Sequence, residues 1–341
     1  MNIKMSRKRA LCLQVCGVCA ALVLAACAGG AASGNTATAS SATSIAAASS
    51  PSTAAGLKKV KWGKNLTVTY SGNTIRLRSN GIPNHSRSAY YAVPNMGVVV
   101  PTAATARVAK DPTKAQSYDF KIPTTPLKIS KTTAAPLGSI GMMISGSVLF
   151  NPYEGDGSTV AMANNFVLTA PGGSKAPFVD ACSGHPTPAM GGGGGQYHYH
   201  GLPACVSKEV DTSAGPSHII GIALDGFPIY GKRDIKGKVI SVSKLDKCNG
   251  ITSPTPEFPK GIYHYVLPGT SNATSSIRCF HGKVDSSLIT KMPNMGGPPG
   301  GGPPGGGPPG GRPPGGGPPP AISLPASVAT RLFCDLAGLS L

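Results

Sequence analysis

Histidines at alternate positions are the residues of this chain best suited to chemistry. His198 and His200 lie in the run Gln-Tyr-His-Tyr-His that begins at Gln196. Alternate residues of a β-strand face the same side, so both imidazoles would face one way and the tyrosines the other. Two imidazoles on one face are typical of β-sheet metal sites, and a third would suit zinc or copper with one position left for water.

A second Tyr-His-Tyr segment offers the third ligand. Its central residue, His264, follows Cys248 by the same 16 residues (248 to 264) that separate His198 from Cys182 (182 to 198). If the two segments pack about a pseudo-two-fold axis, His264 would join the His198 pair. Further candidate ligands for outer or alternate positions are His185, His85 and Asp180.

A structural role is the alternative for the same residues. Buried tyrosines and histidines also pack as core side chains that hydrogen-bond to loop carbonyls. The second segment has Val266 where the first has His200, which excludes two symmetric metal pairs. Asp225 lies in a Leu-Asp-Gly-Phe turn, where an aspartate organises the backbone. Beside a histidine cleft Asp225 would instead be a candidate catalytic base, the basis of a hydrolase alternative.

Known enzyme signatures do not decide between these alternatives. The sequence contains no Gly-x-Ser-x-Gly elbow, no His-Glu-x-x-His motif and no phosphate-binding loop. The five glycines at 191–195 lack the Lys-Ser/Thr pair of a nucleotide site, so no nucleotide cofactor is expected. Whether the protein is an enzyme stays open at this point.

The two segments belong to a longer internal repeat. Each copy reads Cys-x-Gly, then Pro-Thr-Pro, then Tyr-His-Tyr, and the run 141–150 aligns with 221–230. We therefore predict two related half-units, residues 138–210 and 218–282. The same layout predicts two disulfides, Cys182–Cys205 and Cys248–Cys279, each of which closes a loop with a Tyr-His-Tyr segment.

The N-terminus predicts export. Four basic residues precede an apolar run of about fifteen residues, which is too short for a membrane span and typical of a signal peptide, residues 1–26. The sequence Leu24-Ala25-Ala26-Cys27 resembles a bacterial lipobox, so Cys27 is the expected lipidation site and membrane anchor. Ala28, and not an aspartate, follows the cysteine, and by the resemblance to bacterial lipoproteins this implies the outer membrane of a Gram-negative cell. The cell envelope is a compartment that permits disulfides.

Composition divides the rest of the chain. We expect a flexible Ala/Ser/Thr tether at 27–57, a domain at 58–290, a disordered Pro/Gly-rich tract at 291–320 and a tail at 321–341. Short β-like runs separated by turns predict a mainly β, compact, disulfide-linked and sandwich-like domain. These runs are 66–70, 74–79, 139–146, 165–169, 218–224 and 238–243.

The charge is basic but thinly spread. The chain has 31 Lys and Arg against 13 Asp and Glu, a formal net charge of +18, and four of the positive charges lie in the signal. Nucleic-acid binders carry denser basic stripes with interleaved aromatics, so no nucleic-acid partner is expected. Attraction to anionic lipid or envelope polymer is the expected consequence.

These motifs resemble one family. The segments around Cys182, 219–231 and Cys248, with Ser-Asn-Gly-Ile-Pro-Asn-His before residue 86 and Asn-Pro-Tyr-Glu-Gly-Asp-Gly from residue 151, are similar to the YHYH-domain family of exported bacterial proteins over residues 70–282. The resemblance implies an exported or lipid-anchored domain and no established activity. Our leading prediction is divalent transition-metal binding, and the alternative is a structural or adhesive envelope module that binds glycan or polymer.

Overall fold

The computed structural model describes residues 51–188 and 194–289. The predicted signal peptide, the lipidation site Cys27, the Pro/Gly tract at 291–320 and the tail at 321–341 lie outside the described residues. Within the described part, no helix is long and apolar enough to cross a bilayer.

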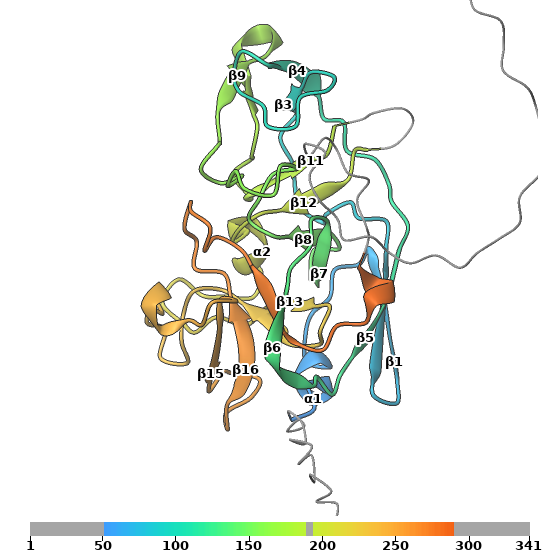
Figure 1. Cartoon of the computed structure of the whole chain (residues 1–341), viewed down its shortest axis with the longest axis vertical. Coiled ribbons are helices and arrows are strands. Elements are labelled where there is room, and N and C mark those ends of the chain that lie inside the picture. Colours follow the sequence, from blue (N-terminus) through green and yellow to red (C-terminus); the bar gives the residue numbers. More distant parts are fainter. Residues whose placement is uncertain (1–50, 189–193, 290–341) are drawn as a thin grey trace, which may run out of the picture. The chain divides into compact units, whose positions relative to one another are not determined.

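Short strands make up most of the regular structure (Figure 1). The strands are β1 (Leu66–Ser71), β2 (Thr74–Ser79), β3 (Tyr90–Pro94), β4 (Ala106–Lys110), β5 (Tyr118–Pro123), β6 (Lys128–Ala134), β7 (Ser139–Met143), β8 (Val148–Phe150), β9 (Val167–Thr169), β10 (Lys175–Pro177), β11 (Gly184–Pro186), β12 (Tyr197–Tyr199), β13 (Ile219–Ala223), β14 (Pro228–Tyr230), β15 (Gly250–Ser253), β16 (Ile262–Val266) and β17 (Cys279–Gly282). The helices are α1 (Ala54–Leu57), α2 (Ala204–Ser207) and the 3₁₀ turns η1 (Pro171–Gly173), η2 (Val242–Lys244) and η3 (Ser286–Leu288). The prediction of a mainly β fold is confirmed.

An eight-stranded sheet forms the centre, in the order β11-β12-β8-β7-β13-β14-β16-β15. Each half-unit contributes four strands with the same connections. In the first, β12 runs parallel to β8 and antiparallel to β11. In the second, β16 runs parallel to β14 and antiparallel to β15. The predicted internal duplication is therefore present in the topology.

The two half-units join through β7 and β13. The pair is antiparallel, and Met142 lies opposite Ile222, its own equivalent in the repeat. On either side, Gly141 pairs with Ala223 and Met143 pairs with Gly221. In the repeat, Gly141 is equivalent to Gly221 and Met143 to Ala223, so a two-fold rotation exchanges these two pairs. A pseudo-two-fold axis therefore passes through the Met142–Ile222 pair.

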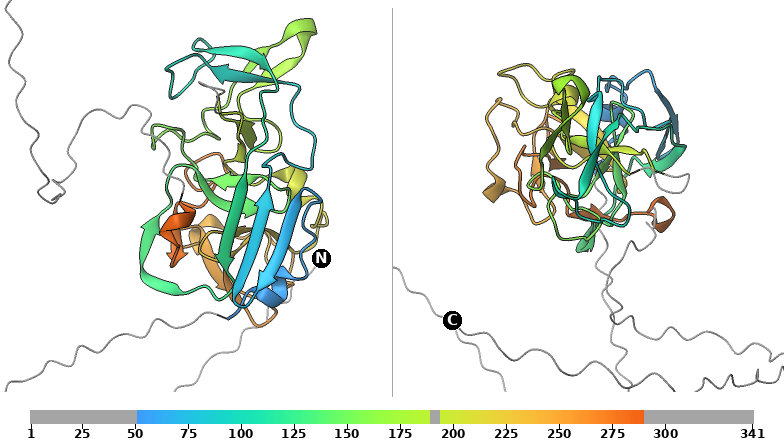
Figure 2. Two further views of the ribbon diagram at one scale, coloured as in Figure 1. Left: turned by 90° about the vertical axis from the view of Figure 1, so that its right-hand side faces the viewer. Right: turned by 90° about the horizontal axis from the view of Figure 1, so that it is seen from above.

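A second layer packs on this sheet. The strands β1, β2 and β5 form a three-stranded antiparallel sheet, seen in Figure 2 (left). Their alternation places Ile75, Leu77 and Ile122 in the same core cluster as Ile140 and Met142. Because two sheets share one core, the domain is sandwich-like, as predicted.

Five of the six predicted strand runs contain strands, and one does not. Residues 238–243 form an isolated bridge between Val239 and Arg233, followed by η2. The Asp234 carboxylate accepts bonds from the backbone N–H groups of Lys236 and Lys238 and holds a tight turn there. Val239 is 63% exposed, so its β-branched side chain has no sheet face to cover.

The packed domain also begins before residue 58. Thr53 and Leu57 are fully buried, and Thr53 bonds to the backbone of Thr124 through both its N–H and its hydroxyl. The last residues of the compositional tether are therefore part of the fold. The small, apolar composition of 53–57 suits a buried short helix as well as a tether.

Both predicted disulfides are present. Cys182 pairs with Cys205, with 5.5 Å between their Cα atoms, and Cys248 pairs with Cys279, with 4.7 Å. Each links the start of the β11 or β15 hairpin to a segment that follows the Tyr-His-Tyr strand. Closure of such loops stabilises each half-unit by about 3 kcal/mol.

Candidate metal centre

Three buried histidines converge at one end of the central sheet. His185 on β11 lies directly opposite His198 on β12, and His200 follows two residues later on the same side. One ring nitrogen from each lies within 4.8 Å of the others. Directly opposed residues of antiparallel strands have neighbouring side chains, so the hairpin register itself assembles the cluster. We call these three residues the histidine triad.

Backbone carbonyls orient two of the three rings. The Nδ1 atom of His198 lies 3.0 Å from the carbonyl oxygen of Gln196, and that of His200 lies 2.7 Å from the carbonyl oxygen of Asn151. A carbonyl only accepts, so Nδ1 of His198 and of His200 carries the proton in each neutral ring and Nε2 carries a lone pair.

The free nitrogens face one another. His198 Nε2 lies 2.9 Å from His200 Nε2, and His185 Nε2 is buried without a hydrogen-bond partner among the described residues. Two lone pairs at this distance repel unless a cation lies between them. Two nitrogens on one tetrahedral zinc, with bonds of 2.0–2.1 Å, are about 3.3 Å apart, so small ring rotations would satisfy a metal.

Aromatic side chains surround the triad. Phe150 stacks on His198 with 4.0 Å between ring centroids, and Phe178 contacts His185 edge to face at 4.5 Å. Burial in this setting lowers the pKa of His200 to about 4. Burial, with the neighbouring imidazoles second, also lowers the pKa of His185 and of His198 well below the ordinary value. The rings are therefore neutral at pH 7, the form that binds metals.

The second half-unit keeps the framework and lacks the triad. In the equivalent hairpin, Ile251 lies opposite His264, and Val266 replaces the third histidine. His264 contacts the Tyr230 ring and bonds to the Ile262 carbonyl. Four strands separate β12 from β16, a distance of about 24 Å at the usual strand spacing. The third imidazole is therefore His185, in contrast to the prediction that His264 would join the pair.

Asp180 is a scaffold residue and not a ligand of the triad. Its carboxylate accepts hydrogen bonds from the hydroxyls of Tyr91 and Tyr197 and from the backbone N–H of Cys182 and Gly184. Asp246 in the second half-unit accepts the equivalent bonds from Tyr263, Cys248 and Gly250. A motif Asp-x-Cys-x-Gly thus anchors a tyrosine 17 residues downstream in both copies, 180 to 197 and 246 to 263.

Asp225 organises the turn between β13 and β14. It is fully buried and accepts bonds from the Tyr265 hydroxyl and from the N–H groups of Gly282 and Phe227. Burial raises its pKa to about 6. Asp225 is shielded from solvent and its carboxylate is already hydrogen-bonded within the turn, so it is not placed to act as a catalytic base beside the histidines.

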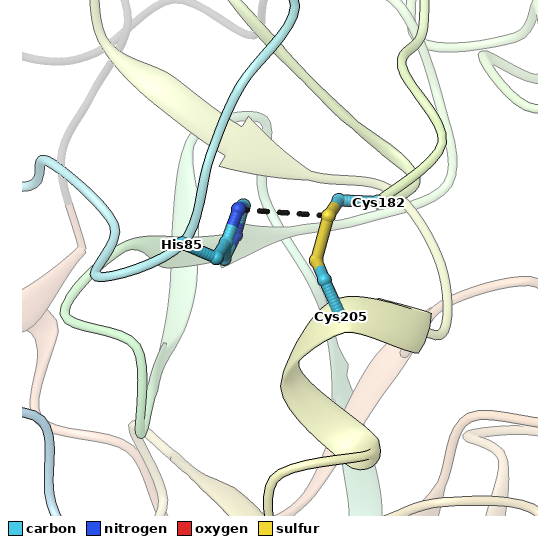
Figure 3. A group of neighbouring side chains, drawn as sticks. All are labelled: His85, Cys182 and Cys205. Atoms are coloured by element: carbon cyan, nitrogen blue, oxygen red, sulfur yellow. Dashed lines mark hydrogen bonds between the residues drawn. A yellow bond between two sulfur atoms is a disulfide. The ribbon is translucent and has the colours of Figure 1, made fainter.

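His85 lies apart from the triad, on the tyrosine face of β12. Its Nε2 is 2.6 Å from the Tyr199 hydroxyl, and its Nδ1 is 3.5 Å from the Sγ of Cys182 (Figure 3). His85, Cys182 and Cys205 form a second group of close potential ligands, in which both sulfurs are held in a disulfide. His85 is therefore not part of the candidate metal centre.

Acidification should destabilise the metal-free protein. The pKa of His200 is about 6.5 in the unfolded chain and about 4 in the folded protein. As the pH falls, His200 is therefore protonated first in the unfolded state, which shifts the equilibrium towards unfolding. Stability is full above pH 6.5 and falls towards pH 4, by about 3 kcal/mol from His200 alone. Urea unfolding in chelator at pH 7.5 and 4.5 measures this loss. A His200→Val variant with an unchanged pH dependence would contradict it.

Comparisons with known proteins identify one family. The family model described as "YHYH protein" matches residues 119–238 and 233–282. These ranges contain the triad, both disulfides and both Tyr-His-Tyr strands. No curated protein and no solved structure matches the chain.

Proposed function

The chain belongs to the YHYH protein family, and from that premise we propose that its YHYH domain binds one divalent transition-metal ion, zinc or copper, through His185, His198 and His200. The main observation that supports this proposal is the arrangement of the ring nitrogens. Backbone carbonyls accept hydrogen bonds from Nδ1 of His198 and of His200, and the Nε2 atoms of these two rings lie 2.9 Å apart. Metal-binding histidines typically have their second nitrogen fixed in this way.

The donor set narrows the choice of ion. Three neutral imidazoles with no carboxylate or thiolate suit borderline ions, and affinity rises along the series to copper before it falls at zinc. Calcium and magnesium prefer oxygen ligands, which the triad does not supply. With three protein ligands, a zinc or copper ion keeps a coordination position for water or a substrate atom.

A structural module is the second candidate. The observation that favours it is the second half-unit, which folds in the same way around Ile251, His264 and Val266. In the second half-unit, tyrosine and histidine side chains therefore fill the core without three imidazoles that converge on one point. In that case the triad would be a packing variant, and the surface would bind an envelope glycan or polymer.

One double variant separates the two candidates. His185→Ile/His200→Val copies the second half-unit, so the core keeps apolar side chains that this framework already accommodates. We expect wild-type protein to bind one equivalent of zinc or copper and this variant to bind none, measured by titration calorimetry and elemental analysis. His264→Ala is the matched control, because it removes the equivalent of His198 outside the triad, and it should bind as wild type does.

Two results would overturn the metal proposal. One is wild-type protein that takes up no zinc or copper after incubation with either ion and removal of excess. The other is equal binding by wild type and His185→Ile/His200→Val. Circular dichroism of each variant establishes that a loss of binding is not a loss of fold.

We also propose that the domain is displayed on the cell envelope by lipid on Cys27. The supporting features are the basic and apolar N-terminus, the Leu-Ala-Ala-Cys sequence and the two disulfides, which persist in oxidising compartments. The basic charge would then favour contact with anionic lipid or polymer. A Cys27→Ser chain that still fractionates with membranes would refute the anchor.

A further inference from the structure

The two disulfides occupy equivalent positions in the repeat but differ in their surroundings. Cys248 is fully buried and Cys279 is 8% exposed. No hydrogen bond joins either sulfur to a titratable side chain within the described residues. In the first half-unit, Cys182 is 7% exposed and lines a surface pocket of about 410 Å³, and Cys205 lies half-buried in the short helix α2. The first disulfide is therefore the more accessible of the two, through Cys205.

A histidine stands beside this disulfide. His85 Nδ1 lies 3.5 Å from Cys182 Sγ and 2.9 Å from the Ser86 carbonyl oxygen (Figure 3). The carbonyl can only accept, so Nδ1 carries the proton. On the other side of the ring, Nε2 accepts from the Tyr199 hydroxyl at 2.6 Å, and the Tyr199 oxygen lies 2.8 Å from Ser145 Oγ. This chain of contacts holds the tautomer whose N–H is next to the sulfur.

The pocket adds basic groups beside Cys182. Arg87 and Lys175 line it, together with Asp180. Arg87 is paired with Asp111 at 2.8 Å, and the Asp180 carboxylate is engaged by tyrosines and backbone N–H groups. Nearby cations and hydrogen-bond donors favour a thiolate over a thiol. The two basic groups are thus offset by Asp111 and Asp180, and the group that favours negative charge on the Cys182 sulfur is the His85 N–H.

We propose that Cys182–Cys205 is a reducible redox disulfide that exchanges with a dithiol, with His85 as hydrogen-bond donor to the leaving sulfur. A thiolate of the dithiol attacks Cys205 Sγ, the more exposed side, and forms a mixed disulfide. The Cys182–Cys205 bond breaks, its electron pair passes to Cys182 Sγ, and His85 Nδ1–H stabilises that thiolate as a hydrogen-bond donor while it keeps its proton.

The second thiol of the reductant completes the exchange. It loses its proton and attacks its partner sulfur in the mixed disulfide, which releases Cys205 as a thiolate and the reductant as a cyclic disulfide. The protein gains two electrons and, at neutral pH, up to two protons, and the dithiol loses the same number. The inference is independent of the metal proposal, because the sulfurs and His85 are not part of the triad.

Reduction rates test the proposal in the full chain. The oxidised protein is treated with dithiothreitol in chelator at pH 7.5, quenched with iodoacetamide, and analysed by peptide mass spectrometry. We expect Cys182 and Cys205 to become alkylated at least about tenfold faster than Cys248 and Cys279, the internal control. His85→Ala should slow the first pair by about tenfold, because the leaving thiolate loses a hydrogen bond, and leave the second pair unchanged.

A conservative variant distinguishes loss of the N–H donor from a general structural effect of replacing His85. His85→Asn keeps an N–H donor close to the position of Nδ1, so its rate should lie between those of wild type and His85→Ala. Equal reduction of the two disulfides in wild type would overturn the proposal, even if neither His85 variant folds. So would a rate for the Cys182 pair that is the same in wild type and both variants.

Discussion

Replacement of Asp180 by alanine is expected to lower the free energy of unfolding by about 3–5 kcal/mol. The carboxylate lies 2.7 Å from the Tyr91 hydroxyl and 2.8 Å from the Tyr197 hydroxyl. It also accepts from the N–H groups of Cys182 and Gly184. All four donors lie in the buried part of the fold, so removal of the acceptor leaves each without its partner.

The repeat provides the matched comparison for this change. Asp246→Ala removes the equivalent carboxylate, which serves one tyrosine instead of two and whose side chain is 32% exposed. Water can replace some of its bonds, so we expect roughly half the loss. Urea denaturation of both variants measures the difference. A cost of Asp180→Ala no larger than that of Asp246→Ala would contradict the central role of Asp180.

Gly226→Ala is expected to cost at least about 3 kcal/mol. Gly226 has a φ of +91°, which an L side chain rarely adopts. A Cβ there would also overlap the backbone carbonyl oxygen of Pro123, at the end of β5. Since a backbone oxygen cannot rotate away, either the turn after β13 or the contact between the two sheets must shift.

A second glycine isolates the backbone contribution. Gly97 has a φ of +80°, and a Cβ there would meet nothing within 4 Å. Gly97→Ala should therefore cost only the conformational strain, about 1–2 kcal/mol. Thermal and urea unfolding of both variants compare them. Equal costs would show that the close approach of β5 does not constrain the turn.

Duplicated local motifs made much of this fold predictable. The offset from cysteine to histidine is the same in both copies, which predicts the two half-units and both disulfides, because equivalent segments fold alike. The pair His198 and His200 followed from strand alternation alone. What these patterns do not contain is the order of strands within the sheet.

Strand order explains where the site prediction failed. His264 was expected beside His198, but the half-units meet through β7 and β13, with β12 and β16 far out on opposite sides. His185 was only an outer candidate, because its place opposite His198 depends on the hairpin register across the glycine run. The motif Asp-x-Cys-x-Gly, present in both copies, was a usable signal for the role of Asp180.

The Met142–Ile222 pair bears on the ancestry of the chain. In this pair, equivalent residues of the two half-units face each other, so both half-units use the same surface to form their interface. Such an interface is called isologous, and it is the arrangement found in two-fold homodimers. The domain thus has the architecture of a homodimer whose subunits have been fused into one polypeptide. A true homodimer must carry the same side chains in both subunits. Fusion removes that constraint, and it accounts for three histidines at positions of one half whose equivalents in the other half are Ile251, His264 and Val266.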